Sequence, residues 1–436
     1  MSWIDRYRLK LYLRNSIWIL PSVSIVAGLI AVTLLNRIDR VLGWEMSLGT
    51  DTAQIVMGTV AASMFTLVVV SSSAVLVTVQ LASAQLTPRI VLLVYRSRNR
   101  KLCVSAFVFT FTFSVSALVR IESTVPFLTS YVAAYGFLLN LALFLYFVDS
   151  MGKTLRPGSA LQVVGLSGRE VVQSVYPSKL KREQPSVSKP LETGDKDPRR
   201  VIFNEVDGVV LAFDRRGLVL LAERSNCLIE LVPEVGDFVA AGDPLFRIYE
   251  GGEDVSGESL RQSVALGQER TFEQDPMYAF RIMVDIASKA LSPAINDPTT
   301  AVLAIDQIHH LLRDVGSRSL AEGREVDRNG QLRLVYRTPN WEDFVLLAVT
   351  EIRQYGRDSI QIMRRLRAML ENLIETLPAK RVPMLELELN LLQSSAKRTF
   401  LDLYDQALAE TGDLQGMGGG HKKQNHHEEH GVSAIA

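Results

Sequence analysis

The chain has 436 residues, with 47 basic and 47 acidic side chains, a formal net charge of zero and 47% hydrophobic residues. This length suggests two or three domains, and the balanced charge gives no indication of a nucleic-acid partner or an acidic substrate. The sequence has two cysteines, Cys103 and Cys227, and neither has a second ligand at metal-binding spacing. The sequence therefore predicts neither a disulfide framework nor a zinc site.

Residues 1–16 form a basic leader. If this leader is a helix, Trp3, Tyr7 and Leu11 lie together on an apolar face. Arg6, Lys10 and Arg14 then lie together on a basic face. Such a helix suits the interface between anionic headgroups and acyl chains. A short solvated leader is the alternative.

Residues 17–150 are expected to form a transmembrane domain of four helical spans, because about 20 mostly apolar residues cross the hydrocarbon core as a helix. The four segments are 17–36, 52–85, 102–119 and 127–148. The second is too long for a helix perpendicular to the membrane, so it tilts or extends beyond the bilayer. The first could instead be a signal peptide, but its apolar run ends at Asn36 without a small-residue cleavage site.

Basic residues near the span ends favour one orientation. Three segments on one side of the membrane are rich in them: the one before the first span, the loop between the second and third spans, and the one after the fourth. Their basic residues are Arg6, Arg8, Lys10 and Arg14, then Arg89, Arg96, Arg98, Arg100 and Lys101, and finally Lys153 and Arg156. The opposite loops carry Arg37, Arg40 and Arg120. We therefore expect a multi-pass protein of the bacterial inner (plasma) membrane, with both termini in the cytoplasm and the lipid bilayer as a partner.

The second span carries a polar residue at every seventh position: Thr52, Thr59, Thr66, Ser73, Gln80 and Thr87. A seven-residue repeat keeps one seam facing a partner or an axis, and polar groups face acyl chains only at a cost. One interpretation is a homo-oligomer with a water-filled path lined by Thr59, Thr66, Ser73, Gln80 and Thr87. The other is hydrogen bonding between helices without transport. No ionisable residue lies well inside a span, which argues against a proton-coupled pump and leaves a passive pore for an unidentified ion or small ligand.

Residues 151–200 are predicted as a juxtamembrane segment and linker, and residues 201–255 as a small β-sandwich. Its expected strands lie at 208–214, 217–224 and 226–232. The pattern G-D-x-V-x-x-G-x-P-L at 236–245, in which Gly236 and Gly242 permit tight turns, resembles half of a lipoyl/biotinyl-like β-sandwich. No lysine occurs between residues 201 and 250, so no lipoyl or biotin cofactor is expected there.

Residues 256–411 are predicted as a mainly helical cytoplasmic domain. Within it, 268–310 is a helical pair broken at Ser292-Pro293, and Asp297 is the expected N-cap of the second helix, with Pro298 at its first position. The segments RTFEQDPxxxxR at 270–281, DIASKALSPAINDPTTA at 285–301 and VQLASAQLTPR at 79–89 resemble the bacterial membrane-protein family defined by domain of unknown function 2254. The resemblance covers most of the chain and implies a multi-span membrane protein with a cytoplasmic region, without implying a reaction.

The same block supplies the candidate residues for binding a partner or a small anion: Arg270, Glu273, Asp275, Arg281, Asn296 and Asp297. Backbone N–H groups at the helix start after Asn296 suit an anion. Asp285 and Lys289 are spaced as an ion pair on a helix. The alternative interpretation is a capped helix–helix junction with surface ion pairs. The sequence contains no recognisable catalytic motif, and the adjacent His309 and His310 point in different directions on a helix, so we expect neither an enzyme nor a metal site.

At the C-terminal end, residues 331–337 are predicted as a strand, 341–376 and 382–409 as two long helices, and 412–436 as a disordered, His-rich tail. Five arginines enrich part of the first long helix: Arg353, Arg357, Arg364, Arg365 and Arg367. A solvated helix face is the default expectation for them, and a membrane surface or a partner subunit is the alternative. Two functions compete: an oligomeric channel modulated by its cytoplasmic domain, and a membrane-anchored scaffold or sensor.

Overall fold

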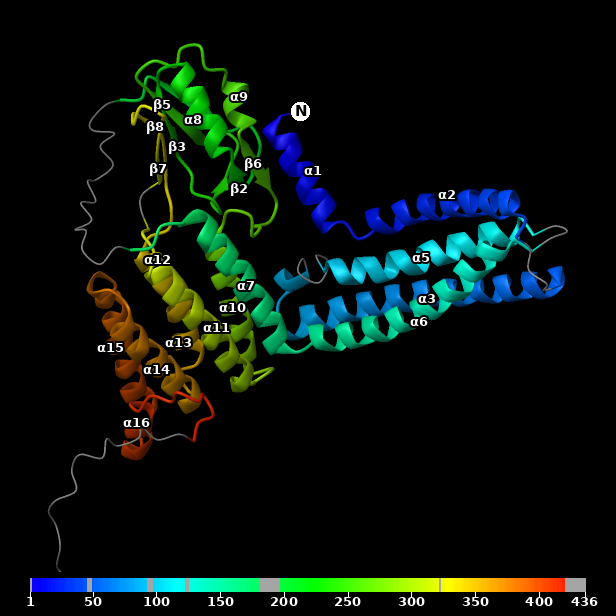
Figure 1. Cartoon of the computed structure of the whole chain (residues 1–436). Helices are drawn as coiled ribbons and strands as arrows, with labels where there is room; N and C mark the ends of the chain where they lie inside the picture. Colours follow the sequence, from blue (N-terminus) through cyan, green and yellow to red (C-terminus); the bar gives the residue numbers. More distant parts are fainter. Residues whose placement is uncertain are drawn as a thin grey trace, which may run out of the picture. The chain divides into compact units, whose positions relative to one another are not determined.

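The structure is a computed structural model that describes residues 2–44, 49–91, 97–121, 125–180, 197–320 and 323–419. The chain divides into two compact units, one formed by Asp5–Ala160 and the other by Leu161–Ala436 together with Met1–Ile4. We call them the membrane unit and the soluble unit. Figure 1 shows the helices and strands of each.

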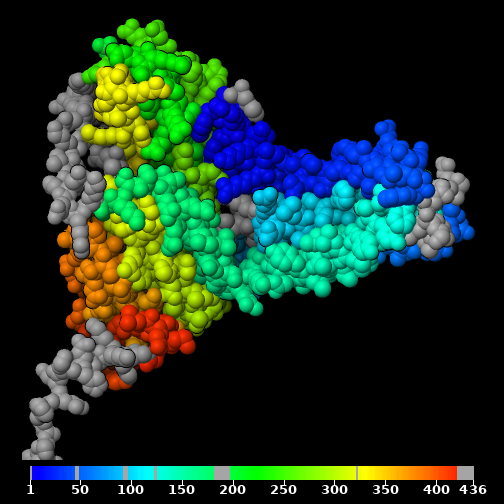
Figure 2. Space-filling view, viewed as in Figure 1, coloured from blue at the N-terminus to red at the C-terminus, as the bar shows by residue number. Residues whose placement is uncertain are grey.

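Four helices of the membrane unit are long and apolar enough to cross a bilayer, in agreement with the four predicted spans. They are α2 (Ile19–Leu42), α3 (Thr50–Gln85), α5 (Arg98–Leu118) and α6 (Phe127–Thr154). They lie side by side, and α5 contacts the other three (Figures 1 and 2). The short helix α1 (Trp3–Asn15) precedes them, and the 3-10 turn η1 (Pro88–Ile90) follows α3.

Side-chain contacts fix the directions of these helices: Gln54 contacts the carbonyl of Ile121, Asn140 contacts Met64, and Thr78 contacts Met151. Helix α3 therefore runs antiparallel to α5 and parallel to α6. The starts of α2 and α5 and the ends of α3 and α6 share one end of the bundle, which we call the α1 end.

The first span is longer than predicted. It continues past Asn36 to Leu42 and ends at Gly43, whose φ of 61° is a left-handed helix cap. The prediction was wrong because Asn36 and Asp39, polar by type, are 6% and 4% exposed and bind another helix. The Asp39 carboxylate accepts from the backbone N–H groups of Leu128 (2.9 Å) and Thr129 (3.2 Å), which are orphan donors at the start of α6.

The soluble unit contains two β-sheets. The five-stranded sheet has the order β1 (Arg200–Phe203), β5 (Pro244–Tyr249), β3 (Leu228–Leu231), β8 (Leu332–Tyr336) and β7 (Gly323–Val326), and only its β3–β8 pair is parallel. The three-stranded sheet has the order β4 (Phe238–Val239), β2 (Gly208–Phe213) and β6 (Val264–Gly267). Strands β6, β7 and β8 come from outside 201–255. Figure 2 shows the yellow residues of β7 and β8 against the green ones.

One predicted strand is a helix. Residues 217–224 lie in α8 (Arg215–Arg224), which starts at the N-cap Asp214, whose side chain accepts from the N–H of Gly217 at 3.0 Å. Leu218 and Ala222 are both fully buried and stand one helical turn apart, so a helix buries the apolar residues of this run on one face. The predicted strands at 208–214, 226–232 and 331–337 are confirmed by β2, β3 and β8.

The helical part of the soluble unit begins with α7 (Pro157–Val175), which crosses from the membrane unit, and the short α9 (Gly257–Arg261). The predicted helical pair is α10 (Pro276–Ala290) and α11 (Pro298–Gly316), with Asp297 and Pro298 in their predicted capping positions. Helix α7 lies close to this pair, since a Cβ at Gly168 would be 2.5 Å from that of Ala279.

The two long C-terminal helices are each interrupted. The first consists of α12 (Trp341–Val345), the π-helical turn η2 (Leu346–Thr350), α13 (Glu351–Tyr355) and α14 (Ile360–Thr376). The second consists of α15 (Val382–Thr399), after the 3-10 turn η3 (Ala379–Arg381), and α16 (Leu403–Ala409). The first break falls at Gly356, where a Cβ would be 2.9 Å from the carbonyl oxygen of Ile352. The second break precedes Asp402, which caps α16.

Of the five arginines of this region, Arg357 is exposed as expected, but Arg364 and Arg365 are buried. Arg364 is fully buried and donates to the carbonyls of Thr411 and Gly418, and Arg365 pairs with Asp306. The default expectation was wrong for Arg364 and Arg365 because carbonyls and a carboxylate of neighbouring segments bind these side chains. Residues 412–419 are held by the same contacts, so the expected disordered tail does not begin at 412, and its remainder at 420–436 lies outside the described residues.

Candidate functional site

The polar seam of the second span lies on the outside of the bundle. We use "polar seam" for Thr52, Thr59, Thr66, Ser73 and Gln80, all of which lie on α3 and are exposed. The opposite face of α3, which includes Met57, Met64, Ser71 and Thr78, is buried against the other helices. Thr87 is separate from the seam, because α3 ends at Gln85 and Thr87 is a buried cap of η1.

Two of the seam hydroxyls bond within their own helix. Thr59 donates to the carbonyl of Ile55 at 2.8 Å and Thr66 to that of Ala62 at 3.0 Å. This internal bond lowers the cost of placing a hydroxyl in an apolar medium. Gln80 has a longer amide side chain with two donors and an acceptor, and no local bond of this type satisfies all of them. The polar seam is therefore a row of exposed polar side chains along the outer face of α3.

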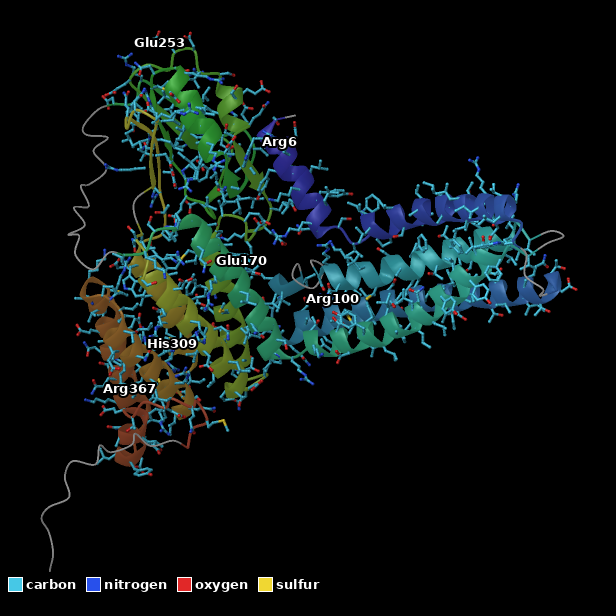
Figure 3. All side chains as sticks on the ribbon, viewed as in Figure 1. Arg6, Arg100, Glu170, Glu253, His309 and Arg367 are labelled. Atoms are coloured by element: carbon cyan, nitrogen blue, oxygen red, sulfur yellow. The ribbon has the colours of Figure 1, made fainter. Side chains whose placement is uncertain are left out.

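Polar contacts inside the bundle also link α5 to α6. The side-chain amide of Asn140 donates to the Thr110 hydroxyl at 2.7 Å, and Asn140 is 1% exposed. At the α1 end, Arg100 donates to Thr154 at 2.6 Å (Figure 3 labels Arg100). Asn140 and Thr110 were not among the predicted residues, although an Asn in the middle of an apolar span is itself a signal of helix–helix hydrogen bonding.

In the soluble unit, the RTFEQDP segment meets the turn after β3. The Arg270 guanidinium donates to the carbonyl of Gly236 through Nε (3.1 Å) and Nη2 (2.9 Å), and its Nη1 lies 3.4 Å from Asp275 Oδ2. Gly236 has φ of +100°, and a Cβ there would be 2.8 Å from Arg270 Cζ and 3.0 Å from the Asp275 carboxylate. The structure therefore joins the RTFEQDP segment to the glycine-containing turn pattern at 236–245. We call this contact the Arg270 junction.

Other side chains of the segment complete this contact. The Gln274 amide accepts from the N–H of Phe213 at 3.1 Å and donates to its carbonyl at 3.2 Å, so it pairs with the end of β2 as a neighbouring strand would. Asp275 accepts from the N–H groups of Met277 (3.0 Å) and Tyr278 (3.1 Å) and so caps α10, with Pro276 at its first position. The segment connects the three-stranded sheet to α10.

Carboxyl groups gather at this junction. Burial, followed by the charge of Asp237, raises the pKa of Glu234 to about 7, although Arg337 opposes the rise. Asp275 is 2% exposed, and burial raises its pKa to about 6 against the opposing effect of Arg270. Perturbed acids near neutral pH are typical of functional sites, although ion-pair networks also produce them. Glu234 was not among the predicted residues, because nothing in its local sequence indicates burial.

The remaining candidate residues lie elsewhere along α10. Arg281 binds Glu351 through Nη1 (2.6 Å) and Nη2 (2.7 Å) and also binds Asp285. Asn296 and Asp297 follow the other end of α10, and the Asp297 carboxylate accepts from the Thr300 N–H at 3.1 Å. Glu273 is half-buried in the segment before α10. The six candidates therefore do not converge on one point.

Metal and histidine chemistry is not indicated in the described part of the chain. No group of three or more His, Cys, Asp or Glu residues there is placed to hold a metal ion. His309 pairs with Asn372 at 2.9 Å, and Figure 3 places it on α11 beside α14, which carries Arg367. Burial lowers the pKa of His309.

Comparisons with known proteins agree with this architecture. A family described as "Predicted membrane protein (DUF2254)" matches residues 14–372. Two uncharacterised relatives, one from Mycobacterium bovis and one from Mycobacterium tuberculosis, are each 27% identical over 422 residues, covering 91% of this chain and 79% of the relative. No solved structure matches the chain. Because the family match extends over most of the chain, the protein belongs to the DUF2254 family of membrane proteins.

Proposed function

We propose that the protein forms a homo-oligomer in the bacterial inner membrane, in which the polar seam faces neighbouring copies and lines a polar path. The observation that carries the proposal is the exposure of all five seam residues on the outer face of one bundle. From Thr52 to Gln80 the seam rises by about 42 Å, against a hydrocarbon core of about 30 Å. A continuous polar row of this length is more favourable against other polar side chains and water than against lipid.

The proposal includes a cytoplasmic soluble unit that modulates the path. With four membrane-spanning helices, an even number, the segment before α2 and the segment after α6 lie on the same side of the membrane. The excess of basic residues at the α1 end favours the cytoplasm for that side.

A matched pair of cysteine variants tests the seam. Thr66 on α3 and Leu139 on α6 are both exposed, and they lie at similar depth because the neighbouring Met64 and Asn140 are in contact. The background carries Cys103→Ala and Cys227→Ala, which remove two buried thiols. We expect Thr66→Cys to cross-link between copies on oxidation and to react with a small water-soluble methanethiosulfonate, and Leu139→Cys to do neither.

Oligomeric state and flux complete the test. Native mass spectrometry from nanodiscs should give an oligomer, and liposomes loaded with K⁺ or Cl⁻ should show a passive leak that Ser73→Phe reduces at least severalfold. A monomer, together with equal reactivity at positions 66 and 139, would contradict the proposal. Flux that is unchanged by Ser73→Phe would remove the path while leaving the oligomer.

A membrane-anchored scaffold or sensor is the second candidate, favoured by the acids of the Arg270 junction. Glu234 and Asp275 change charge close to neutral pH at the point where the sheets meet α10. Under this candidate, a change of pH shifts the mobility of this junction and alters what the soluble unit binds. Hydrogen–deuterium exchange of the full chain at pH 6 and pH 8 should then differ at residues 232–238 and 276–280, and Glu234→Gln should remove the difference. Identical exchange at both pH values would sink this candidate.

A further inference from the structure

The apolar residues of α1 lie on two opposite sides of the helix. Trp3, Tyr7 and Leu11, the face predicted to contact lipid, are half-buried. On the other side, Leu9, Tyr12 and Leu13 are 45%, 54% and 50% exposed. Spacings of three and four residues place these three side chains together on one face. None of these three residues belongs to the face that the sequence predicts to contact lipid.

Basic residues border this exposed face on both sides. At about 100° per residue, Arg8 lies on one flank, and Arg6 and Lys10 lie on the other. All three are exposed, and α1 contains four basic residues and one acid. Long basic side chains beside an apolar face can keep their stems in the apolar layer while their charges reach the headgroups.

Chain connectivity and contacts hold α1 close to the starts of α2 and α5. Three residues separate Asn15 from the start of α2 at Ile19, and they span at most about 10 Å. Trp18 in this connection is 59% exposed, and its ring lies 6.3 Å from that of Tyr12. Lys101, near the start of α5, donates to the carbonyl of Arg14 at 2.7 Å. Helix α1 therefore lies next to the starts of α2 and α5. Its aromatic residues are of the type found at the lipid–water interface.

We infer that α1 lies on the leaflet at the α1 end, with Leu9, Tyr12 and Leu13 in the acyl boundary and its flanking basic residues bound to anionic phospholipid headgroups. The apolar face supplies the anchor, and the charges supply a preference for anionic over zwitterionic lipid. Each basic residue near an anionic surface contributes about 1 kcal/mol, or roughly fivefold in affinity. The inference does not rest on an oligomer or on a transport path.

Fluorescence quenching in proteoliposomes tests this placement. The full chain, again with both native cysteines replaced by alanine, carries an environment-sensitive nitrobenzoxadiazole label at Leu13→Cys or, as the control, at Arg8→Cys on the flank. Lipids spin-labelled just below the headgroup should quench the label at position 13 at least twofold more than the label at position 8. Equal quenching at the two positions would overturn the placement of this face.

The headgroup preference has its own comparison. Quenching at position 13 should increase severalfold when phosphatidylglycerol replaces part of a phosphatidylcholine bilayer, and Arg6→Gln with Lys10→Gln should remove that increase. No dependence on the anionic lipid would overturn the headgroup contact. Loss of the increase on adding millimolar inorganic phosphate at constant ionic strength would assign the basic residues to free phosphate and overturn lipid as their ligand.

Discussion

Gly236 stands where the turn after β3 meets the Arg270 guanidinium and the Asp275 carboxylate. It has a matched control in Gly242, because both residues have positive φ, of 100° and 93°, but a Cβ at Gly242 would meet nothing within 4 Å. Alanine at a left-handed position costs about 1 kcal/mol in backbone strain, and overpacking adds about 1–3 kcal/mol. We therefore expect Gly236→Ala to lower the unfolding free energy by about 2–4 kcal/mol and Gly242→Ala by about 1 kcal/mol.

Thermal unfolding of the detergent-solubilised full chain, followed by intrinsic fluorescence and calorimetry, compares the two variants. Gly236→Ala should melt several degrees below Gly242→Ala. Equal melting temperatures would show that the Arg270 junction yields to an added methyl group and does not hold the turn rigidly.

The raised pKa of Glu234 has a definite consequence for stability. Its carboxyl group has an ordinary pKa of 4.5, and burial raises the pKa to about 7 in the folded protein. Between these pH values the folded state binds more protons than the unfolded state, so this group lowers stability as the pH rises from about 4.5 to 7. Glu234→Gln, which stays neutral, should flatten the fall in melting temperature across this window and melt above the wild type at pH 8.

Two control variants separate burial from charge in this effect. Asp237→Asn removes the neighbouring charge that raises the Glu234 pKa, so it should shift the fall towards lower pH without abolishing it. Glu258→Gln changes an exposed acid on α9 and should leave the profile unchanged. A wild-type melting temperature that does not fall between pH 5 and 7 would contradict the raised pKa.

At the scale of elements, helix starts were more predictable than helix interiors. The pairs Asp275-Pro276 and Asp297-Pro298 both cap helices, because the carboxylate accepts orphan N–H groups and proline needs no such bond. Only the second pair was identified as a cap from the sequence. The run at 217–224 was mistaken for a strand because its apolar residues fit either period over eight positions, and the deciding cap, Asp214, lies before it. The π-helical turn at 346–350 has no comparable local signal in the sequence. It depends on how the segments on its two sides, α12 and α13, pack against other helices.

Those two sides are held by two ion pairs, of which the Arg353–Glu388 pair is buried. Glu351 binds Arg281 on α10, while Arg353 Nε donates to Glu388 on α15 at 2.9 Å. The Glu388 side chain is 1% exposed and that of Arg353 is 11% exposed. Removing one partner leaves a charge without compensation, so Glu388→Leu should cost about 3–5 kcal/mol of unfolding free energy.

The double variant Arg353→Met with Glu388→Leu should recover most of that loss, since no unpaired charge then remains buried. Chemical denaturation of the full chain gives the free energies of the single and double variants, and their cycle gives the coupling. Additive losses would show that the two charges stabilise the fold independently. Arg367→Met serves as the control, because Arg367 pairs with Glu371 one turn along the same helix and the two side chains are 16% and 29% exposed; it should cost about 1 kcal/mol or less.

At the scale of the whole molecule, span number was predictable and the inner face of each span was not. Length and apolar composition alone identify four crossing helices. On α3, however, residues spaced by seven occur on two faces: Met57, Met64, Ser71 and Thr78 are buried, while the polar seam is exposed. A single sequence does not say which of two such faces meets the other helices, because serine and threonine occur on both. The Arg270 junction could not be predicted from the sequence either, because Arg270 and Gly236 are 34 residues apart.

The two ends of the bundle differ in charge, which predicts the orientation of the whole chain. Arg6, Arg8, Lys10, Arg14, Arg98, Arg100, Lys101, Lys153 and Arg156 are among the basic residues at the α1 end, whereas Arg37, Arg40 and Arg120 belong to the other end. Because basic loops stay in the cytoplasm, the α1 end and the soluble unit should be cytoplasmic. Val41, 85% exposed in the last turn of α2, and Gln85, at the end of α3, mark the two ends.

Single cysteines at these positions decide the orientation in intact bacterial cells. A membrane-impermeant maleimide should label Val41→Cys directly and should label Gln85→Cys only after the cells are permeabilised. The reverse pattern would place the soluble unit outside the cytoplasm and would remove the basis for cytoplasmic modulation of the path. Labelling of both sites in intact cells would instead mean that the bundle inserts in two orientations. In that case, substituting arginines for Ser97 and Asn99 at the α1 end should enrich the cytoplasmic orientation, because the orientation depends on the difference in basic charge between the ends.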